Sequence, residues 1–145
     1  MRTLSLTLVC SIAASLFAKW LADRFLMAPI PIVGSFIGLS YTENPGVAFG
    51  VTFPPVLQAL LIFVSLFFVT WAAFAAHGHS TRTDIGFGLI LGGAGANLLD
   101  RLRDGLVTDF LAVRFFSVFN VADACITVGA LLFAIDLLAK RRPGR

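Results

Sequence analysis

The stretch Asn97–Asp123, NLLDRLRDGLVTDFLAVRFFSVFNVAD, joins two strongly apolar segments and itself carries four aspartates and three arginines. Asp100 directly follows the apolar run that ends at Leu99, and Asp123 lies at the start of the next run. Asp109 lies between them among apolar neighbours. Ionisable groups are costly beside hydrocarbon, so membrane chains seldom keep them without a function. The stretch therefore predicts two carboxylates presented at one membrane face as a candidate acid–base pair.

The composition is that of an integral membrane protein. The 145 residues are 58% hydrophobic and 13% charged, whereas soluble domains average about 45–50% apolar and about 25% charged residues. At about 20 residues a helix, this length allows four spans and modest loops. The net charge of +3 does not indicate nucleic acid, because four basic residues lie together in 140–145. Such a tail is typical of an anchor on the inner leaflet.

Four apolar runs predict one integral-membrane domain over residues 1–145 with four transmembrane helices. The expected spans lie at about 4–22, 56–76, 83–101 and 121–139, so the fold class is an all-α membrane protein. The first run could also be a cleavable signal peptide, but further spans downstream favour a retained helix. The third run is rich in glycine and alanine, which is typical of closely packed membrane helices.

Residues 23–55 do not resemble a span. They contain β-branched residues, several prolines and glycines, and the turn sequence Glu43-Asn44-Pro45-Gly46. This pattern predicts short strands joined by turns, as a small β-rich segment between the first and second helices. The asymmetry of basic residues then orients the chain: six lie on the side of the termini and four on the other. The termini are therefore expected in the cytoplasm, and 23–55 and 100–120 on the extracytoplasmic face.

Several polar or reactive residues have ordinary structural explanations. His77 and His79 have the spacing of a metal-binding pair, but no third ligand lies nearby in the sequence, so a short inner loop is preferred. Cys10 and Cys125 both fall within apolar runs and are expected as free, packed thiols. Asp136 and Lys140 are four residues apart and predict an ion pair at the end of the fourth helix.

The aspartates of the stretch Asn97–Asp123 differ in whether a structural role could explain them. Asn120 and Asp123 have the spacing of a helix cap, an interpretation about as strong for Asp123 as catalysis. Asp109 has no such explanation, and its pKa should be raised near lipid unless it finds a partner. One ionised and one protonated carboxylate can together activate water and polarise a carbonyl. Asp100 is expected to pair with Arg101 rather than to take part in chemistry.

Four motifs carry a resemblance to a known family. They are Asn44–Gly50 (NPGVAFG), Gly92–Ala94 with Asn97–Arg101 (GGA, NLLDR), Val107–Phe110 (VTDF) and Phe119–Asp123 (FNVAD). In this order the motifs resemble lipoprotein signal peptidase, the membrane aspartyl protease also called signal peptidase II. The resemblance covers essentially the whole chain.

The resemblance implies an enzyme of the bacterial inner membrane that removes signal peptides from diacylglyceryl-modified prolipoproteins, cutting before the lipidated cysteine. It implies that Asp109 and Asp123 are the catalytic dyad, with no cofactor and no metal. The expected partners of this monomer are the prolipoprotein and membrane lipids, and not nucleic acid. Gly46, Ala48 and Gly50 are expected to form a small-residue wall of the substrate groove. The residues expected to support the site or hold the substrate are Lys19, Asn44, Gly46, Asn97, Asp100, Arg101 and Asn120.

The chain departs from the family pattern at three positions. The family usually has an aspartate four residues before the lysine of the first helix, and this chain has Ser15 there. Ala96 replaces a usual glycine, and Ala124 replaces a usual serine. These departures leave the dyad in place and concern how the site is supported.

A small membrane chain of this kind has two alternative classes of function besides a peptidase. A small four-helix transporter would place a carboxylate deep within a span for coupling, whereas the acids of this chain cluster at one face. A non-catalytic membrane assembly factor would explain the small-residue helix faces but not the paired aspartates.

Overall fold

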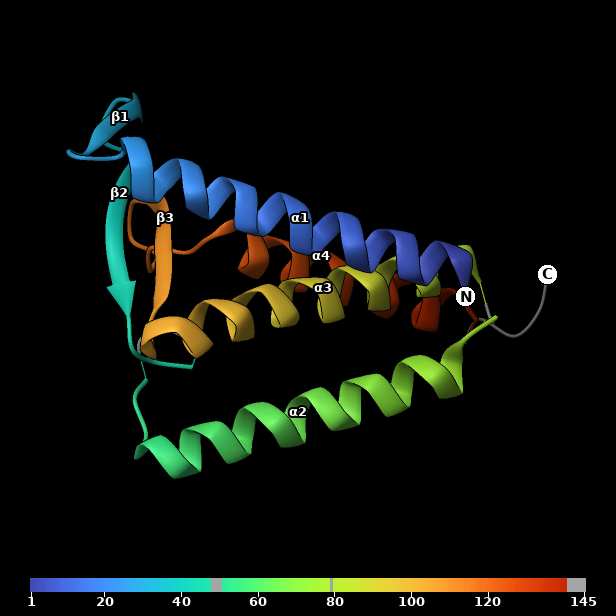
Figure 1. Ribbon diagram of the computed structural model, residues 1–145. Coiled ribbons are helices and arrows are strands. Elements are labelled where there is room, and N and C mark those ends of the chain that lie inside the picture. The colour runs from blue at the N-terminus through green and yellow to red at the C-terminus, as the bar shows by residue number, and fades with distance from the viewer. Residues whose placement is uncertain (48–50, 79, 141–145) are drawn as a thin grey trace.

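The computed structural model describes residues 1–47, 51–78 and 80–140, and four helices dominate it. In chain order they are α1 (Arg2–Phe25), α2 (Pro55–Ala76), α3 (Thr81–Asp104) and α4 (Val121–Lys140). Each helix contains one of the four predicted ranges. Figure 1 shows the helices running side by side, with the strands gathered at one end. The amino terminus and the C-terminal end of α4 lie at the opposite end.

Three of these helices, α1, α2 and α4, are long and apolar enough to cross a membrane, with mean hydropathies of 1.7, 2.3 and 2.1. The helix α3 does not reach the same apolarity, because it is interrupted by glycines and carries charged residues near both ends. It is instead the most buried helix, and it packs mainly against α4 and α1. In a membrane protein, a helix covered by its neighbours presents little surface to lipid, and polar residues are tolerated where they face the bundle interior.

Small residues let α3 approach its neighbours closely. A Cβ atom at Gly88 would lie 2.8 Å from the backbone oxygen of Leu4, and one at Gly92 would lie 2.7 Å from that of Leu8. On the other face of α3, a Cβ at Gly93 would collide with the backbone of α4. The close packing predicted from the glycine-rich run is confirmed, and it explains the central place of α3.

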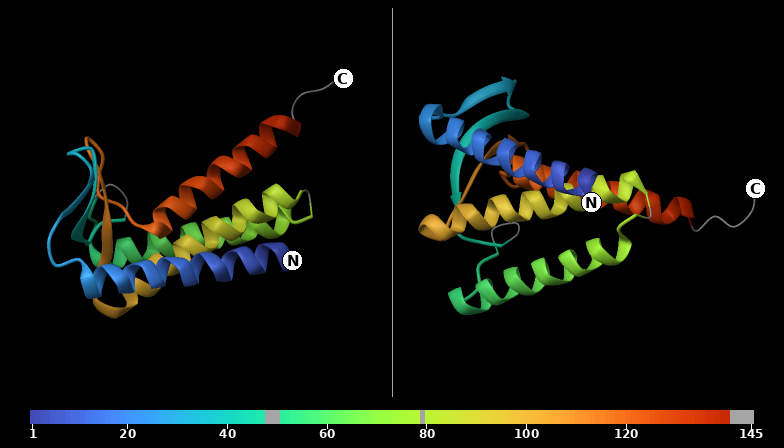
Figure 2. Two further views of the ribbon diagram at one scale, coloured as in Figure 1. Left: turned by 90° about the horizontal axis from the view of Figure 1, so that it is seen from above. Right: turned by 45° about the vertical axis from the view of Figure 1, so that its right-hand side comes forward.

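The helices α2 and α4 are less enclosed. Only Ala73 of α2 is buried, and α2 contacts α3 more than any other element. Figure 2 shows α4 diverging from α1 and α3 toward its C-terminal end. Large apolar side chains are exposed along both helices, including Phe63, Phe67 and Leu131. Such surfaces are those that lipid covers in a membrane protein.

A three-stranded antiparallel sheet closes one end of the bundle. Its order is β1 (Ile30–Val33), β2 (Ile37–Asn44) and β3 (Val107–Val113). The prediction of strands only between the first and second helices is therefore too narrow, since β3 comes from the segment between α3 and α4. Residues 107–110 of β3 are all buried, so this strand lacks the exposed polar face that makes a strand recognisable in sequence.

The register of the sheet places key residues on one face. Thr42 of β2 pairs with Asp109 of β3, and Asn44 pairs with Val107. Residues two apart in a strand share a face, so Asn44 and Asp109 are diagonal neighbours. Such neighbours are close enough for polar side chains to meet.

Three smaller predictions have different outcomes. Cys10 is exposed rather than packed, while Cys125 is half-buried, and both are free. Asp136 accepts a hydrogen bond from Oγ1 of Thr83 at 2.8 Å. The side chain of Lys140 lies outside the described residues, so its predicted ion pair with Asp136 stays a prediction.

The loop between α2 and α3 holds His77. Its Nδ1 lies 2.9 Å from a carboxylate oxygen of Asp84, and its Nε2 lies 2.7 Å from the amino group of Met1. His79, the other member of the predicted pair, lies outside the described residues.

Candidate active site

A groove of about 610 Å³ lies where β3, the end of α3 and the start of α4 meet. Both carboxylates singled out in the sequence, Asp109 and Asp123, line it. The other polar residues of the lining are Asn44, Asn97, Arg101, Ser117 and Thr127. The apolar part of the lining comprises Val47, Val107, Phe116, Val118, Phe119, Ala124, Ile126 and Val128. The groove thus combines an acidic pair with a large apolar wall, as ligand sites commonly do.

Asp109 is held in β3 with only 2% of its surface exposed. Its Oδ2 accepts a hydrogen bond from the amide of Asn44 at 2.9 Å, and its Oδ1 accepts one from the amide of Asn120 at 2.8 Å. Burial raises the pKa of Asp109 to about 6, although the bond from Asn44 opposes this shift. The negative charge of Asp123 raises this pKa further, and the guanidinium of Arg101 lowers it. The raised pKa expected from the sequence is confirmed.

Asp123 lies in the first turn of α4 and takes part in its cap. Its backbone N–H donates to Oδ1 of Asn120 at 3.0 Å, and its own Oδ2 accepts from the backbone N–H of Asn120 at 3.3 Å. This is the reciprocal arrangement of a capping box. The other oxygen, Oδ1, accepts a hydrogen bond from the amide of Asn97 at 2.8 Å. Capping and a place in the groove are therefore compatible for this carboxylate.

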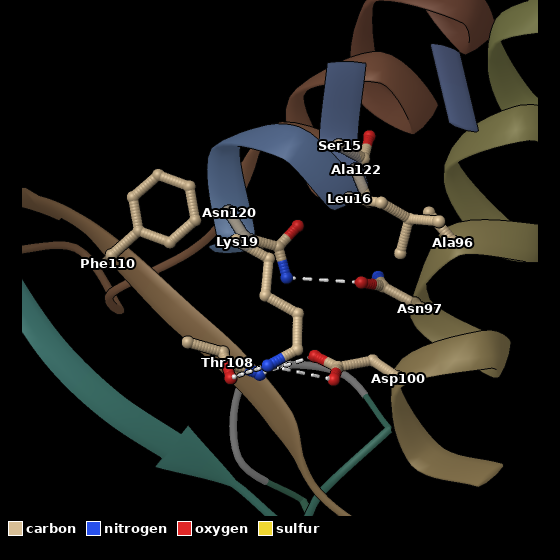
Figure 3. Close-up of a pocket in the computed structure, with 10 residues that line it drawn as sticks. All are labelled: Ser15, Leu16, Lys19, Ala96, Asn97, Asp100, Thr108, Phe110, Asn120 and Ala122. Carbon is tan, nitrogen blue, oxygen red and sulfur yellow. Dashed lines mark hydrogen bonds and ion pairs between the residues drawn. The ribbon is translucent and has the colours of Figure 1, made fainter. Parts of the chain in front are cut away.

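Two amide side chains connect the carboxylates. The amide nitrogen of Asn120, which donates to Asp109, also lies 3.1 Å from Oδ1 of Asn97, and Figure 3 shows this contact between α3 and the start of α4. The amide of Asn97 in turn donates to Asp123. This relay fixes the orientation of both carboxylates from the end of α3 and the start of α4.

Arg101 fastens the turn after β2 to the end of α3. Its Nη2 donates to the backbone oxygen of Gly46 at 2.5 Å, and its Nη1 donates to that of Asn97 at 3.4 Å. Gly46 is buried, and its N–H donates to Oδ1 of Asn44 at 2.8 Å. Asn44 and Arg101 line the groove, and Gly46 is bonded to both without belonging to the lining. Ala48 and Gly50, the other members of the predicted small-residue wall, lie outside the described residues.

The predicted ion pair between Asp100 and Arg101 is wrong. Consecutive residues of a helix point in different directions, so Arg101 faces the groove while Asp100 faces α1. There Asp100 lies 3.2 Å from Nζ of Lys19 and accepts a hydrogen bond from the backbone N–H of Thr108. Lys19 and Asp100 therefore lie behind the groove rather than in it.

The sequence reasoning missed three polar residues that join Lys19 behind the groove. They are Asp23, Tyr41 and Thr108, which contact Lys19 or one another. The spacing of Lys19 and Asp23, four residues apart on a helix, was the available signal for one of them. A small cavity of about 10 Å³ also lies here, lined among others by Lys19 and by the two departure positions Ser15 and Ala96.

Comparison with known proteins shows the family of the chain. The model of the family described as signal peptidase (SPase) II matches residues 7–139. The chain belongs to the signal peptidase II family. Membership in signal peptidase II does not favour the transporter or the assembly factor weighed above.

Two curated relatives show the extent of the similarity to signal peptidase II. The lipoprotein signal peptidase of Caldanaerobacter subterraneus subsp. tengcongensis is 38% identical over 128 residues, which cover 86% of this chain and 88% of that protein. The lipoprotein signal peptidase of Chlorobium luteolum is 36% identical, over 93% of this chain and 90% of its own length.

Solved structures resemble this signal peptidase II chain in fold. One, described as a bacterial membrane enzyme solved by the in meso method at 2.3 Å resolution, matches with a TM-score of 0.85. The match covers 100% of this chain and 94% of that one, at 20% identity. A second bacterial membrane enzyme, solved at 1.9 Å, matches with a TM-score of 0.81 at 22% identity, over 95% of this chain and 94% of that one.

Proposed function

We propose that Asp109 and Asp123 are the catalytic dyad with which this member of the signal peptidase II family removes signal peptides from diacylglyceryl-modified prolipoproteins, cutting before the lipidated cysteine. The observation that carries the proposal is the pKa of Asp109, raised to about 6 beside the charge of Asp123 in one groove. Two neighbouring carboxylates of this kind share a single proton up to about pH 6, and this is the state that an aspartyl protease requires.

The chemistry then follows from the positions of the two acids. The protonated member of the pair donates a hydrogen bond to the oxygen of the scissile carbonyl, while the ionised member takes a proton from the attacking water. The hydroxide adds to the carbonyl carbon, and the proton returns to the leaving nitrogen as the C–N bond breaks. Asp109 holds the shared proton in the free enzyme because burial disfavours its charge. The amides of Asn97 and Asn120 hold the two carboxylates in the same relative orientation during both steps.

The apolar wall of the groove is suited to a lipid-modified substrate. Phe116, Val118, Phe119 and Ile126 line it beside the acids. Acyl chains held in the outer leaflet would bring the scissile bond to the level of the dyad, so that lipid burial serves positioning. The polar side chains of Asn44 and Arg101 then face the peptide part of the substrate.

The proposal includes four crossings of the bacterial inner membrane, with α3 as the fourth membrane helix and both termini in the cytoplasm. The sheet and the dyad then lie on the extracytoplasmic face of a monomer surrounded by lipid. The excess of basic residues near the termini supports this orientation, as does the position of the sheet opposite the amino terminus (Figure 1).

Cysteine labelling tests the orientation. Ser35 and Ser117 are both exposed, so a cysteine at either position, in a background without Cys10 and Cys125, should react with an impermeant reagent added from outside. Labelling of these sites only after the membrane is opened would reverse the orientation.

Cleavage of a lipidated precursor by detergent-purified protein tests the dyad. Asp109→Asn and Asp123→Asn should each abolish cleavage while the variants still insert and bind the precursor. Asp104→Asn is the matched control, since Asp104 is exposed at the same end of the bundle and, among the described residues, its side chain bonds only to the backbone N–H of Leu106. The activity of the parent should survive a chelator. Substantial turnover by either dyad variant, or loss of the parent's activity with the chelator, would overturn the aspartyl mechanism.

A further inference from the structure

The ammonium group of Lys19 is fully engaged by three side chains. Its Nζ lies 2.6 Å from Oδ2 of Asp23, 2.9 Å from Oγ1 of Thr108 and 3.2 Å from Oδ1 of Asp100. An ammonium has three N–H donors, so each donor has one acceptor. The lysine side chain is only 15% exposed, which makes these contacts its main solvation. Figure 3 shows the ammonium between Thr108 and Asp100.

This cluster lies directly behind Asp109. Successive residues of a strand point to opposite faces, so Thr108 faces Lys19 while Asp109 faces the groove. The backbone N–H of Thr108 donates to Oδ2 of Asp100 at 2.8 Å. Lys19 and Asp100 thus hold both the side chain and the backbone of the residue that precedes Asp109. The position of β3 at the dyad depends on where the ammonium lies.

Asp23 is the outer member of the cluster, one helical turn after Lys19. Besides its contact with Lys19, its Oδ1 accepts from the hydroxyl of Tyr41 at 3.2 Å and lies 3.5 Å from Oγ1 of Thr108. The carboxylate therefore links α1 to β2 and β3. Its side chain is 30% exposed, so as an isolated ion pair it would contribute little. Its effect comes from holding the ammonium in the one position that also reaches Thr108.

The turn before Lys19 has no acid. Ser15, four residues earlier on the same face of α1, is 6% exposed, and its Oγ has no hydrogen-bond partner among the described residues. It lines the small cavity together with Lys19 and Asp100 (Figure 3). The cavity provides some of the room that a carboxylate at position 15 would need to approach the ammonium.

We propose that Asp23 is a positioning residue, which supplies from the turn after Lys19 the carboxylate that the turn before, with Ser15, does not supply. Through Lys19 and Thr108 it keeps β3, and with it Asp109, aligned with Asp123. The inference rests on the proposed function of the dyad. It explains how this chain keeps its site supported with a serine at position 15.

Three variants of the full-length protein test the charge itself. Asp23→Asn should lower kcat for a lipidated precursor about tenfold, because small displacements of a reacting group reduce turnover strongly, with KM little changed. Asp23→Glu, which keeps the charge, should retain most of the activity. Glu43→Gln is the matched control, since it removes one exposed carboxylate from the same sheet and should leave kcat unchanged. Asp23→Asn as active as Glu43→Gln would overturn the proposal.

A double-mutant cycle tests the route through Lys19. If Asp23 acts by holding the ammonium, Lys19→Met with Asp23→Asn should be no less active than Lys19→Met alone. Losses of kcat that multiply in the double variant would show an independent role and overturn the proposal.

A carboxylate placed at position 15, on the turn before Lys19, should rescue the Asp23→Asn variant. A merely structural role of Asp23 would give no such rescue. Ser15→Asp should recover at least half of the kcat lost in Asp23→Asn. If the double variant keeps the Tm of the parent but recovers no kcat, a carboxylate at position 15 cannot replace Asp23, and the proposal is contradicted. A parent that fails to cleave the precursor at all would instead refute the proposed function, so the two failures are distinguishable.

Discussion

The side-chain amide of Asn120 donates a hydrogen bond to Oδ1 of Asp109 at 2.8 Å. The same side chain accepts from the backbone N–H of Asp123 through its Oδ1. One residue therefore ties a strand carboxylate to the helix start that carries the second carboxylate. The cap of α4 and the alignment of the proposed dyad depend on the same side chain.

Substitution of Asn120 can separate these two roles. Asn120→Ala should lower the free energy of unfolding by about 1 kcal/mol through loss of the cap and should also lower turnover. Asn120→Ser keeps a good capping oxygen but cannot reach Asp109, so its turnover should fall while its Tm stays near that of the parent. The measurements are Tm in detergent and kcat on a lipidated precursor. Full activity of Asn120→Ser would show that the amide does not orient Asp109.

The pH dependence of cleavage should report the proton on the dyad. The pKa of Asp109 is raised to about 6, and a one-proton dyad loses its proton as the pH rises through this value, so kcat/KM of the parent should decline above about pH 6. The bond from Asn44 favours the ionised form and lowers this pKa. Asn44→Ala should therefore raise the pKa and move the decline to higher pH, whereas Glu43→Gln should not move it. A decline that shifts to lower pH in Asn44→Ala would contradict this assignment.

The free energy of unfolding should also depend on pH through the titration of Asp109. The folded-state pKa of Asp109 is above its ordinary value of 3.8, so the native state binds more protons than the unfolded state between about pH 4 and 6. The free energy of unfolding should fall as the pH rises through this window, and the contribution should be constant above it. Asp109→Asn should remove this component from the pH profile of Tm. An unchanged pH profile in that variant would place the titration elsewhere.

The contact between α3 and α4 should tolerate no side chain at Gly93. A Cβ there would meet the backbone of Ala122, next to Asp123, and the side chain of Ile126. Gly93→Ala should thus destabilise the protein by about 1–3 kcal/mol and reduce turnover by displacing α4. Gly95→Ala is the matched control, because its Cβ would lie 3.5 Å from the side chain of Ile12 and needs no rearrangement. Equal Tm values for the two variants would show that α4 can move away freely.

The turn at Gly46 should be equally intolerant. Gly46 is buried, its N–H bonds to Asn44 and its carbonyl accepts from Arg101, so a β-branched side chain should disturb these bonds to two residues that line the groove. Gly46→Val should impair processing, while Glu43→Gln should be nearly neutral in the same cleavage assay. If both variants process the precursor normally, the turn is only a connector.

Features set by neighbours three or four residues apart could be predicted from the sequence. The four helical ranges, the cap formed by Asn120 and Asp123, and the shared face of Asn97 and Arg101 all follow from helical periodicity. The raised pKa of Asp109 could also be predicted, because an acid among apolar residues in a membrane chain has few ways to be solvated. For the helices, the cap and the shared face the local sequence contains the whole physical cause, whereas the pKa of Asp109 also depends on Asn44, Arg101 and Asp123 from other elements.

Other features depend on contacts between residues far apart in the chain. Pairing of β2 with β3 brings Asn44 to Asp109. No local sequence pattern predicts β3, because its first four residues are buried on both faces. The packing of α1 on α3 decides that Asp100 pairs with Lys19 rather than with its neighbour Arg101. It also leaves α3 in the centre, where burial by other helices makes high apolarity unnecessary. Only the tertiary structure could decide these points. A hydrogen bond or ion pair between residues 60 or more positions apart depends on how whole elements pack. The sequence next to either residue does not encode that packing.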